Sequence, residues 1–170
     1  MNQLRLILVS GLPGSGKSFF AEKLAGKIGA IYLNSDYIRS AIHLRGKYTT
    51  SDKAAVYKEM YKQTSNYLQE KKSVVVDATF QLAATRDLFL NLAEEKYISV
   101  FCFEVWADED LIRQRLSQKR VESEADFKIY MVIKEQFEAW TTPRLKLQST
   151  QENISAMLEE AIEYIEGENV

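Results

Sequence analysis

The stretch of sequence that decides the fold of this chain is the octapeptide Gly11-Leu12-Pro13-Gly14-Ser15-Gly16-Lys17-Ser18. It fits the pattern G-x-x-x-x-G-K-[ST] at every fixed position. An apolar run at residues 4–10 precedes it, and a helical pattern at residues 17–28 follows it. This order predicts a buried strand, a loop whose backbone N–H groups surround phosphate oxygens, and a helix whose N-terminus adds positive polarity.

The loop is expected to bind the phosphates of ATP through the residues Gly11, Pro13, Gly14, Ser15, Gly16, Lys17 and Ser18. Lys17 would reach the β- and γ-phosphates, and the Ser18 hydroxyl would be a ligand of Mg²⁺. The loop alone does not distinguish a kinase from a GTPase or a mechanical ATPase. No Asn-Lys-x-Asp motif for guanine occurs, and 170 residues are few for a motor, so a small kinase is favoured.

The composition is that of an ordinary globular protein, with 46% hydrophobic and 27% charged residues. The length predicts a single domain over residues 1–170. A formal net charge of -2 provides no overall positive field for nucleic acid. The single cysteine, Cys102, allows no disulfide within the chain, and no apolar run reaches the roughly 18 residues of a membrane span. We therefore expect a cytoplasmic protein.

Strand and helix patterns alternate along the chain. Apolar runs without polar alternation, such as Val74-Val75-Val76, predict strands buried on both faces, as in a parallel sheet. The expected strands are 4–10, 30–34, 73–78, 98–106 and 144–148. The expected helices are 17–28, 36–44, 52–71, 83–95, one after Asp108, one ending near 140, and one after a capping box at Ser149–Glu152. These elements predict a three-layer α/β domain with helices on both faces of about five strands.

Ligands of such sheets bind beyond the carboxyl ends of the strands, where the chain carries charged residues. Asp36 and Arg39 follow the second expected strand and would share one helix face. Asp36 could accept the proton of an incoming hydroxyl or hold Mg²⁺ through water, and Arg39 could steady the acceptor or the migrating phosphoryl group. The alternative is a surface ion pair in which Asp36 caps the helix.

Further candidates follow the third and fourth strands. Asp77 ends the run of valines, where it could act near Mg²⁺ or simply terminate a strand in a turn. Thr79 and Arg86 could face an acceptor pocket, or else solvent and a helix cap. The cations after the fourth strand could close over the triphosphate or form a solvated basic face; they are Arg113, Arg115, Lys119 and Arg120.

Four motifs occur in the same order in a known family: the phosphate loop, Asn34–Arg39, Val74–Phe80 and Leu111–Leu116. From residue 4 to about 140, the chain resembles the small P-loop kinases. These include the kinase domain of phage T4 polynucleotide kinase, the zeta toxins and AAA-like predicted kinases. The resemblance implies a strand order of 2-3-1-4-5. It departs after the last strand, where relatives often show Leu-x-Leu-Asp-Thr and this chain has Leu145-Lys146-Leu147-Gln148-Ser149, which leaves adenine contact as the expected role of that loop.

The resemblance also implies a role for each candidate residue. Lys17 and Ser18 match the ATP and Mg²⁺ positions, and Asp77 matches the acid after the third strand. Asp36 matches the residue that activates the acceptor hydroxyl, and Arg39 the arginine beside it. Arg115 or Arg120 would match the lid arginine. Ser18, Asp36 and Asp77 are thus the candidate metal residues.

The function expected from these observations is that of an ATP-dependent kinase, a transferase that moves the γ-phosphate to a hydroxyl acceptor. Candidate acceptors are a polynucleotide 5′-hydroxyl, a nucleoside, a sugar or another small molecule. An alternative is an ATP-binding regulatory or toxin-like protein that acts on a protein partner without small-molecule turnover. A nucleic-acid binder that uses the lysines of residues 52–71 is the reading least favoured by the net charge of -2. Neither the acceptor nor the oligomeric state follows from the sequence.

Overall fold

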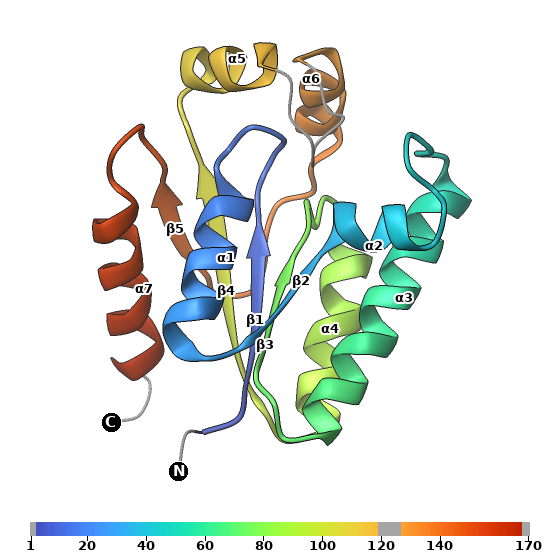
Figure 1. Ribbon diagram of the computed structural model, residues 1–170, viewed down its shortest axis with the longest axis vertical. Coiled ribbons are helices and arrows are strands. Elements are labelled where there is room, and N and C mark those ends of the chain that lie inside the picture. The colour runs from blue at the N-terminus through green and yellow to red at the C-terminus, as the bar shows by residue number, and fades with distance from the viewer. Residues whose placement is uncertain (1–2, 119–126, 168–170) are drawn as a thin grey trace.

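The computed structural model describes residues 3–118 and 127–167, which contain one parallel five-stranded sheet (Figure 1). The strands are β1 (Arg5–Ser10), β2 (Ile31–Asn34), β3 (Val74–Asp77), β4 (Ser99–Trp106) and β5 (Leu145–Gln148). Their order is β2-β3-β1-β4-β5, which confirms the expected one. β1 is central, and it pairs with β3 through Leu6↔Val74 and with β4 through Leu6↔Val100.

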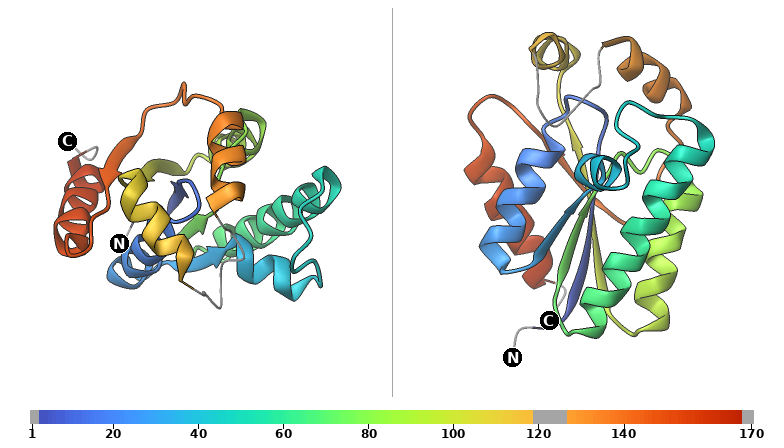
Figure 2. Two further views of the ribbon diagram at one scale, coloured as in Figure 1. Left: turned by 90° about the horizontal axis from the view of Figure 1, so that it is seen from above. Right: turned by 45° about the vertical axis from the view of Figure 1, so that its right-hand side comes forward.

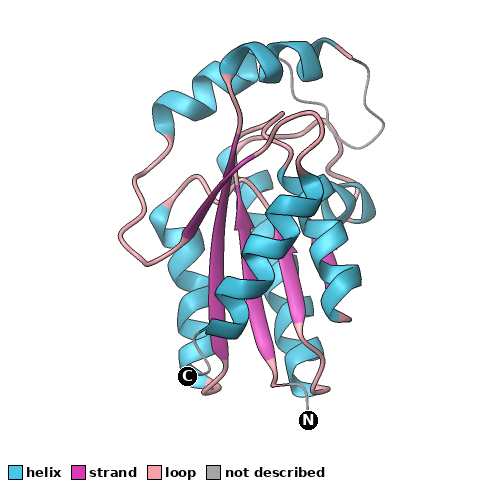
Figure 3. Ribbon diagram, turned by 90° about the vertical axis from the view of Figure 1, so that its left-hand side faces the viewer, coloured by secondary structure: helices cyan, strands magenta, loops and turns pink. Residues whose placement is uncertain are grey.

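Helices cover both faces of the sheet (Figures 1 and 2). The helices are α1 (Lys17–Ile28), α2 (Ser35–Ala41), α3 (Thr50–Gln69), α4 (Ala83–Glu95), α5 (Glu109–Ser117), α6 (Phe127–Gln136) and α7 (Ile154–Gly167). α1 and α7 pack on one face, while α2, α3 and α4 pack on the other. α5 and α6 lie beyond the carboxyl ends of the strands (Figure 3). No helix in the described ranges combines the length and apolar character needed to cross a bilayer.

Apolar side chains of β1 point alternately to the two faces of the sheet, so each face needs a layer of helices to cover it. Leu6 and Leu8 belong to the core under α3 and α4, whereas Ile7 and Val9 belong to the core under α1 and α7. All four side chains are completely buried. Each such side chain contributes about 1.5–3 kcal/mol when it is removed from water. Burial on both faces therefore holds the central strand in place. The phosphate loop follows directly after its last residue, Ser10.

Three expected boundaries differ most from the structure. The helix after Asn34 ends at Ala41, because His43 adopts a left-handed φ of 62° and the Leu44 N–H turns back to the Arg39 carbonyl. The helix expected to reach about residue 140 ends at Gln136. The capping box at residues 149–152 is not formed. α7 begins at Ile154, and the Asn153 carbonyl accepts the first helical hydrogen bond, from Met157 N.

Candidate active site

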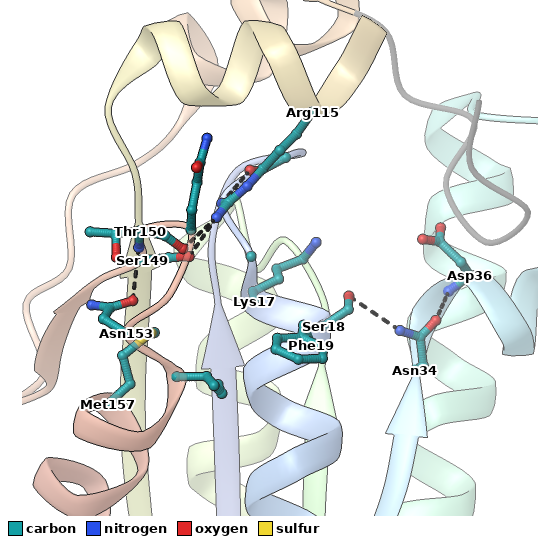
Figure 4. A pocket seen from close by; sticks show the side chains of 14 residues that line it. Lys17, Ser18, Phe19, Asn34, Asp36, Arg115, Ser149, Thr150, Asn153 and Met157 are labelled. Atoms are coloured by element: carbon teal, nitrogen blue, oxygen red, sulfur yellow. Dashed lines mark hydrogen bonds between the residues drawn. The ribbon is translucent and has the colours of Figure 1, made fainter. Parts of the chain in front are cut away.

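A cavity of about 490 Å³ opens at the carboxyl ends of the strands (Figure 4). Its walls come from the phosphate loop and the start of α1, the β2–α2 junction, α5, and the segment from Ser149 to Met157. Lys17, Ser18, Asp36 and Arg115 all line it. These four residues were candidates from the sequence and lie up to about a hundred positions apart. The fold brings them to the same cavity.

The phosphate loop has the backbone geometry that its glycines permit. Gly14 and Gly16 have φ values of 78° and 92°, a region in which side chains are strained. A Cβ atom on Gly16 would lie 2.5 Å from Ser149 Oγ, and one on Gly11 would lie 2.6 Å from the Val105 carbonyl oxygen. Neither position therefore has room for a side chain. The loop leads directly into α1, whose N-cap is Gly16.

Asp77 lies at the end of β3 in a fully buried position beside Val9 and Asn34 of the neighbouring strands. Its Oδ2 atom accepts hydrogen bonds from Tyr32 Oη and from Asn34 Nδ2, both at 2.7 Å. Its other oxygen, Oδ1, is buried and has no hydrogen-bond partner among the described residues. Burying a carboxylate oxygen without a partner is costly, so this atom calls for a cation or another donor.

Ser18 lies next to this carboxylate. Asn34 Nδ2 is 3.5 Å from Ser18 Oγ, and Tyr32 Oη is 3.4 Å from the Ser18 carbonyl oxygen. One carboxylate and one hydroxyl beside a phosphate-binding loop fit Mg²⁺, which is usually held by one or two protein groups together with substrate phosphates. Within the described ranges, no cluster of three His, Cys, Asp or Glu side chains offers an all-protein metal site.

The Tyr32 hydroxyl is a donor in this arrangement. Burial, the charge of Asp77 and the hydrogen bond to Asp77 together raise the pKa of Tyr32 well above its ordinary value. The phenol therefore stays protonated and donates to the carboxylate. Tyr32 and Asn34 are two residues apart in β2, so the period of a strand places their side chains on the same face.

Asp36 and Arg39 take different directions although they are one helical turn apart. Asp36 lines the cavity from the first turn of α2, across from Lys17 and Arg115 (Figure 4). Arg39 is 8% exposed and is absent from the cavity wall. Its Nη1 donates to the Lys47 carbonyl at 2.8 Å, and its guanidinium lies 4.4 Å from the centre of the Tyr48 ring. The two residues are therefore not brought together at the cavity.

Among the cations after β4, the structure separates Arg115 from Arg113. Arg115 reaches from α5 to the phosphate loop and the loop after β5. Its Nη1 donates to the Gly14 carbonyl at 3.1 Å, and its Nη2 donates to Ser149 Oγ at 3.0 Å and to the Thr150 carbonyl at 2.9 Å. Arg113 instead lies over the Phe127 ring at 3.8 Å. Lys119 and the other candidate, Arg120, fall outside the described residues.

Arg86 faces neither an acceptor pocket nor solvent, the two surroundings expected for it. It is 3% exposed and does not line the cavity. Its Nη2 donates to the Glu138 carbonyl at 2.7 Å, and its guanidinium lies 4.6 Å from the centre of the Trp140 ring. Burial lowers its pKa from the ordinary value of an arginine. Arg86, near the start of α4, therefore binds the segment that follows α6.

Sequence reasoning missed several residues of the site, among them Tyr32, Asn34 and Ser149. Asn34 had a usable signal, because an Asn two residues before an acid at a helix start is a good N-cap. Tyr32 and Ser149 had none, since their partners come from β3 and α5. The Ser149 hydroxyl accepts from Arg115 and its backbone N–H donates to the Trp106 carbonyl, so the loop after β5 is joined to α5 and to the end of β4, while its expected adenine contact stays a prediction.

Comparisons with known proteins agree with this architecture. A family model described as an AAA domain matches residues 6–142. Uncharacterized proteins of Mycobacterium bovis and Mycobacterium tuberculosis are 27% identical over 125 residues, which cover 66% of this chain and 25% of each relative. The chain thus spans about a quarter of the length of the curated relatives it matches.

Three solved structures are similar over nearly the whole chain. A sugar kinase from Janibacter superposes with a TM-score of 0.72 at 16% identity, covering 96% of this chain and 95% of that one. The APS kinase of Mycobacterium tuberculosis, in complex with AMPPNP and APS, gives 0.73 at 20%, with 96% and 98% covered. A gluconokinase from Sinorhizobium meliloti gives 0.69 at 17%, with 94% and 89% covered. The chain has the fold of the P-loop kinases.

Proposed function

Because this chain belongs to the AAA domain family, whose model spans the phosphate loop, Asp36, Asp77 and Arg115, we propose that it is an ATP-dependent kinase. It transfers the γ-phosphate of ATP to a hydroxyl group. The observation that carries this proposal is the shared cavity, which Lys17, Ser18, Asp36 and Arg115 line from three separate segments of the chain. Phosphoryl transfer requires mainly positioning and charge neutralisation, and these residues supply both.

The phosphate side of the reaction is formed by the loop and the metal residues. The loop N–H groups and the Lys17 ammonium bind the phosphate oxygens. Ser18 and the unpartnered Oδ1 of Asp77 would hold Mg²⁺, whose charge neutralises the β- and γ-phosphate oxygens. Asp36 could contribute to the same ion through a water molecule. Tyr32 and Asn34 hold the Asp77 carboxylate in place by occupying its other oxygen.

The acceptor side is formed around Asp36. The acceptor oxygen forms a bond to the γ-phosphorus while the bond to the bridging oxygen of ADP breaks. The Asp36 carboxylate accepts the proton of the acceptor hydroxyl. Arg39 does not line the cavity, because Lys47 and Tyr48 hold its guanidinium elsewhere, so its role beside the acceptor stays a prediction. The acceptor is a polynucleotide 5′-hydroxyl, a nucleoside, a sugar or another small molecule.

Arg115 stabilises the charge that develops on the transferring group. Its guanidinium is bound to the Gly14 and Thr150 carbonyls, from which a short shift would direct it to phosphate oxygens. The adenine lies against the loop after β5 and the start of α7, where Ile154 and Met157 offer apolar surface. Asn153 shapes that loop, since its amide accepts from Thr150 N and donates to the Gln148 carbonyl.

The decisive experiment measures ADP production from Mg·ATP in the presence of each acceptor class. We expect one class to raise the rate over the acceptor-free rate, and both Lys17→Ala and Asp36→Asn to abolish the increase. Exposed residues of the same type give matched controls, Lys27→Ala on α1 and Asp87→Asn on α4, which should keep the wild-type rate. If no acceptor raises ADP production while Lys17→Ala still abolishes ATP binding, the kinase proposal fails and the ATP-binding regulatory alternative gains support.

A further inference from the structure

Asn34 joins two parts of the site through the two ends of one side chain. It ends β2 and is the N-cap of α2, with 5% of its surface exposed. Its Oδ1 accepts hydrogen bonds from the backbone N–H groups of Asp36 at 2.9 Å and Tyr37 at 3.1 Å. Its Nδ2 donates to Asp77 Oδ2 at 2.7 Å and to Tyr32 Oη at 2.9 Å, and it lies 3.5 Å from Ser18 Oγ.

The orientation of this amide is determined by its neighbours. The N–H groups of Asp36 and Tyr37 are donors and can meet only the oxygen end. The NH₂ end must then face Asp77, which accepts from it. Ser and Asp cap helices about as well as Asn does, and Thr somewhat less well. Ser and Thr have no NH₂ group, and Asp would place a carboxylate oxygen against Asp77. Of the good capping residues, only asparagine satisfies both ends.

Both partners of the amide are residues that the kinase proposal uses. At one end, the NH₂ group and Tyr32 occupy Oδ2 of Asp77, which leaves Oδ1 as the oxygen free for a cation. At the other end, the cap sets where α2 begins, and Asp36 is the second residue of that helix. The oxygen and nitrogen of a planar amide are fixed relative to each other, so these two ends cannot move independently.

We propose that Asn34 is a positioning residue that sets the spacing between the metal-binding acid Asp77 and the candidate base Asp36. Metal binding and acceptor activation are thereby coupled through one side chain. This inference rests on the proposed kinase function for the role of Asp36, whereas the effect on Asp77 requires only that the chain binds Mg·ATP. The two halves can therefore be tested separately.

The first test measures ATP binding by calorimetry with and without Mg²⁺, in the absence of any acceptor. Asn34→Asp keeps the capping oxygen and loses the donor to Asp77, while Tyr32→Phe removes the other donor without touching α2. Residues that hold a metal ligand in place typically change metal affinity by about 10- to 100-fold when mutated. We expect a loss of that size in the Mg²⁺-dependent part of ATP affinity for Asn34→Asp and a smaller loss for Tyr32→Phe. For Tyr32→Phe, which changes no charge, metal-free ATP binding should change less than Mg²⁺-dependent binding.

The second test separates positioning from folding. Asn34→Ala loses both the cap and the donor, so we expect its turnover to stay low at saturating Mg²⁺, whereas Asn34→Asp recovers as Mg²⁺ is raised. The exposed Asn66 on α3 provides the matched control, and Asn66→Asp should behave as wild type in both tests. Melting temperatures identify any variant that is merely unstable.

The proposal is overturned if Asn34→Asp shows the wild-type Mg²⁺ dependence of ATP binding, or if wild-type ATP binding does not depend on Mg²⁺ at all. Recovery of Asn34→Ala by Mg²⁺ to the same extent as Asn34→Asp would refute the coupling to Asp36. Failure of the kinase proposal has a different signature: no acceptor raises ADP production, while the Mg²⁺ dependence of binding still responds to Asn34→Asp.

Discussion

Arg115 Nη1 lies 3.1 Å from the carbonyl oxygen of Gly14, so α5 is tied directly to the phosphate loop across 101 residues of sequence. The same guanidinium donates to Ser149 and Thr150 in the loop after β5. A single cation therefore contacts both the loop proposed to bind phosphates and the loop proposed to contact adenine. These three acceptors are neutral, and a bond from a guanidinium to a charged phosphate oxygen is stronger than a bond to a neutral oxygen.

Arg115→Ala should therefore reduce turnover more than ATP affinity. Removing one group that stabilises transition-state charge typically lowers kcat by about 100- to 1000-fold. Arg113→Ala is the matched control, because Arg113 contacts Phe127 and Glu109 rather than the loop. Steady-state kinetics at varied ATP concentration separates kcat from KM. A stronger loss from Arg113→Ala than from Arg115→Ala would contradict this assignment.

Gly16→Ala should damage both the loop and the stability of the fold. The added Cβ would lie 2.5 Å from Ser149 Oγ, and the φ of 92° is unfavourable for alanine. The backbone cost alone is about 1–2 kcal/mol. Gly26→Ala is the matched control, since a Cβ there meets no atom within 4 Å in the interior of α1, and we expect it to stabilise by about 0.5–1 kcal/mol. Urea denaturation and ATP titration measure the two effects, and an equal response of both variants would refute the steric argument.

Arg86→Met should destabilise the protein although it keeps much of the side-chain volume. It leaves the Glu138 carbonyl without its charged donor and removes the cation over Trp140. A hydrogen bond to a charged group contributes about 1.5–3 kcal/mol, and we expect a loss of that order in the free energy of unfolding. Lys58→Met on the exposed face of α3 is the control. A wild-type denaturation midpoint for Arg86→Met would show that this contact does not contribute.

Ionisation of Tyr57 should lower the free energy of unfolding at alkaline pH. Its hydroxyl accepts a hydrogen bond from the Phe80 N–H at 3.1 Å, and burial raises the pKa of Tyr57 to about 12. An unfolded tyrosine ionises near pH 10. The folded state thus holds the proton more tightly, so this contribution to stability is fully present below about pH 10 and is lost as the pH rises toward about 12.

Tyr57→Phe should remove the Tyr57 part of this alkaline dependence and leave the part that comes from Tyr32, whose pKa is also raised. It should also leave the Phe80 N–H unsatisfied, at a cost of about 1–3 kcal/mol. Phe80 has a left-handed φ of 51°, so it depends on such contacts to keep its conformation. Denaturation curves between pH 7 and about pH 11 compare the two proteins. If the loss of stability above about pH 10 is as large in Tyr57→Phe as in the wild type, the Tyr57 contribution is refuted and the alkaline loss belongs to other groups such as Tyr32.

Much of the fold could be predicted because its causes are local. The glycines of the phosphate loop, the valines of β3 and the apolar face of α1 each specify an element through their own spacing. The alternation of strands and helices predicted a layered α/β domain, and the strand order implied by the family resemblance is confirmed. The boundaries at residues 149–152 could not be predicted, because the Ser149 hydroxyl is bound by Arg115 rather than by its own helix.

The sequence by itself determined the strand, loop and helix that begin the chain, and with them the class of fold. Only the tertiary structure decided which side chains meet. The parallel register places Asn34 beside Asp77. Contacts with Lys47 and Tyr48 keep Arg39 out of the cavity that Asp36 lines, and Arg86 is buried against Trp140. The physical reason is that local spacing selects a helix or strand, whereas contacts between distant segments depend on how the sheet assembles and which faces its helices cover.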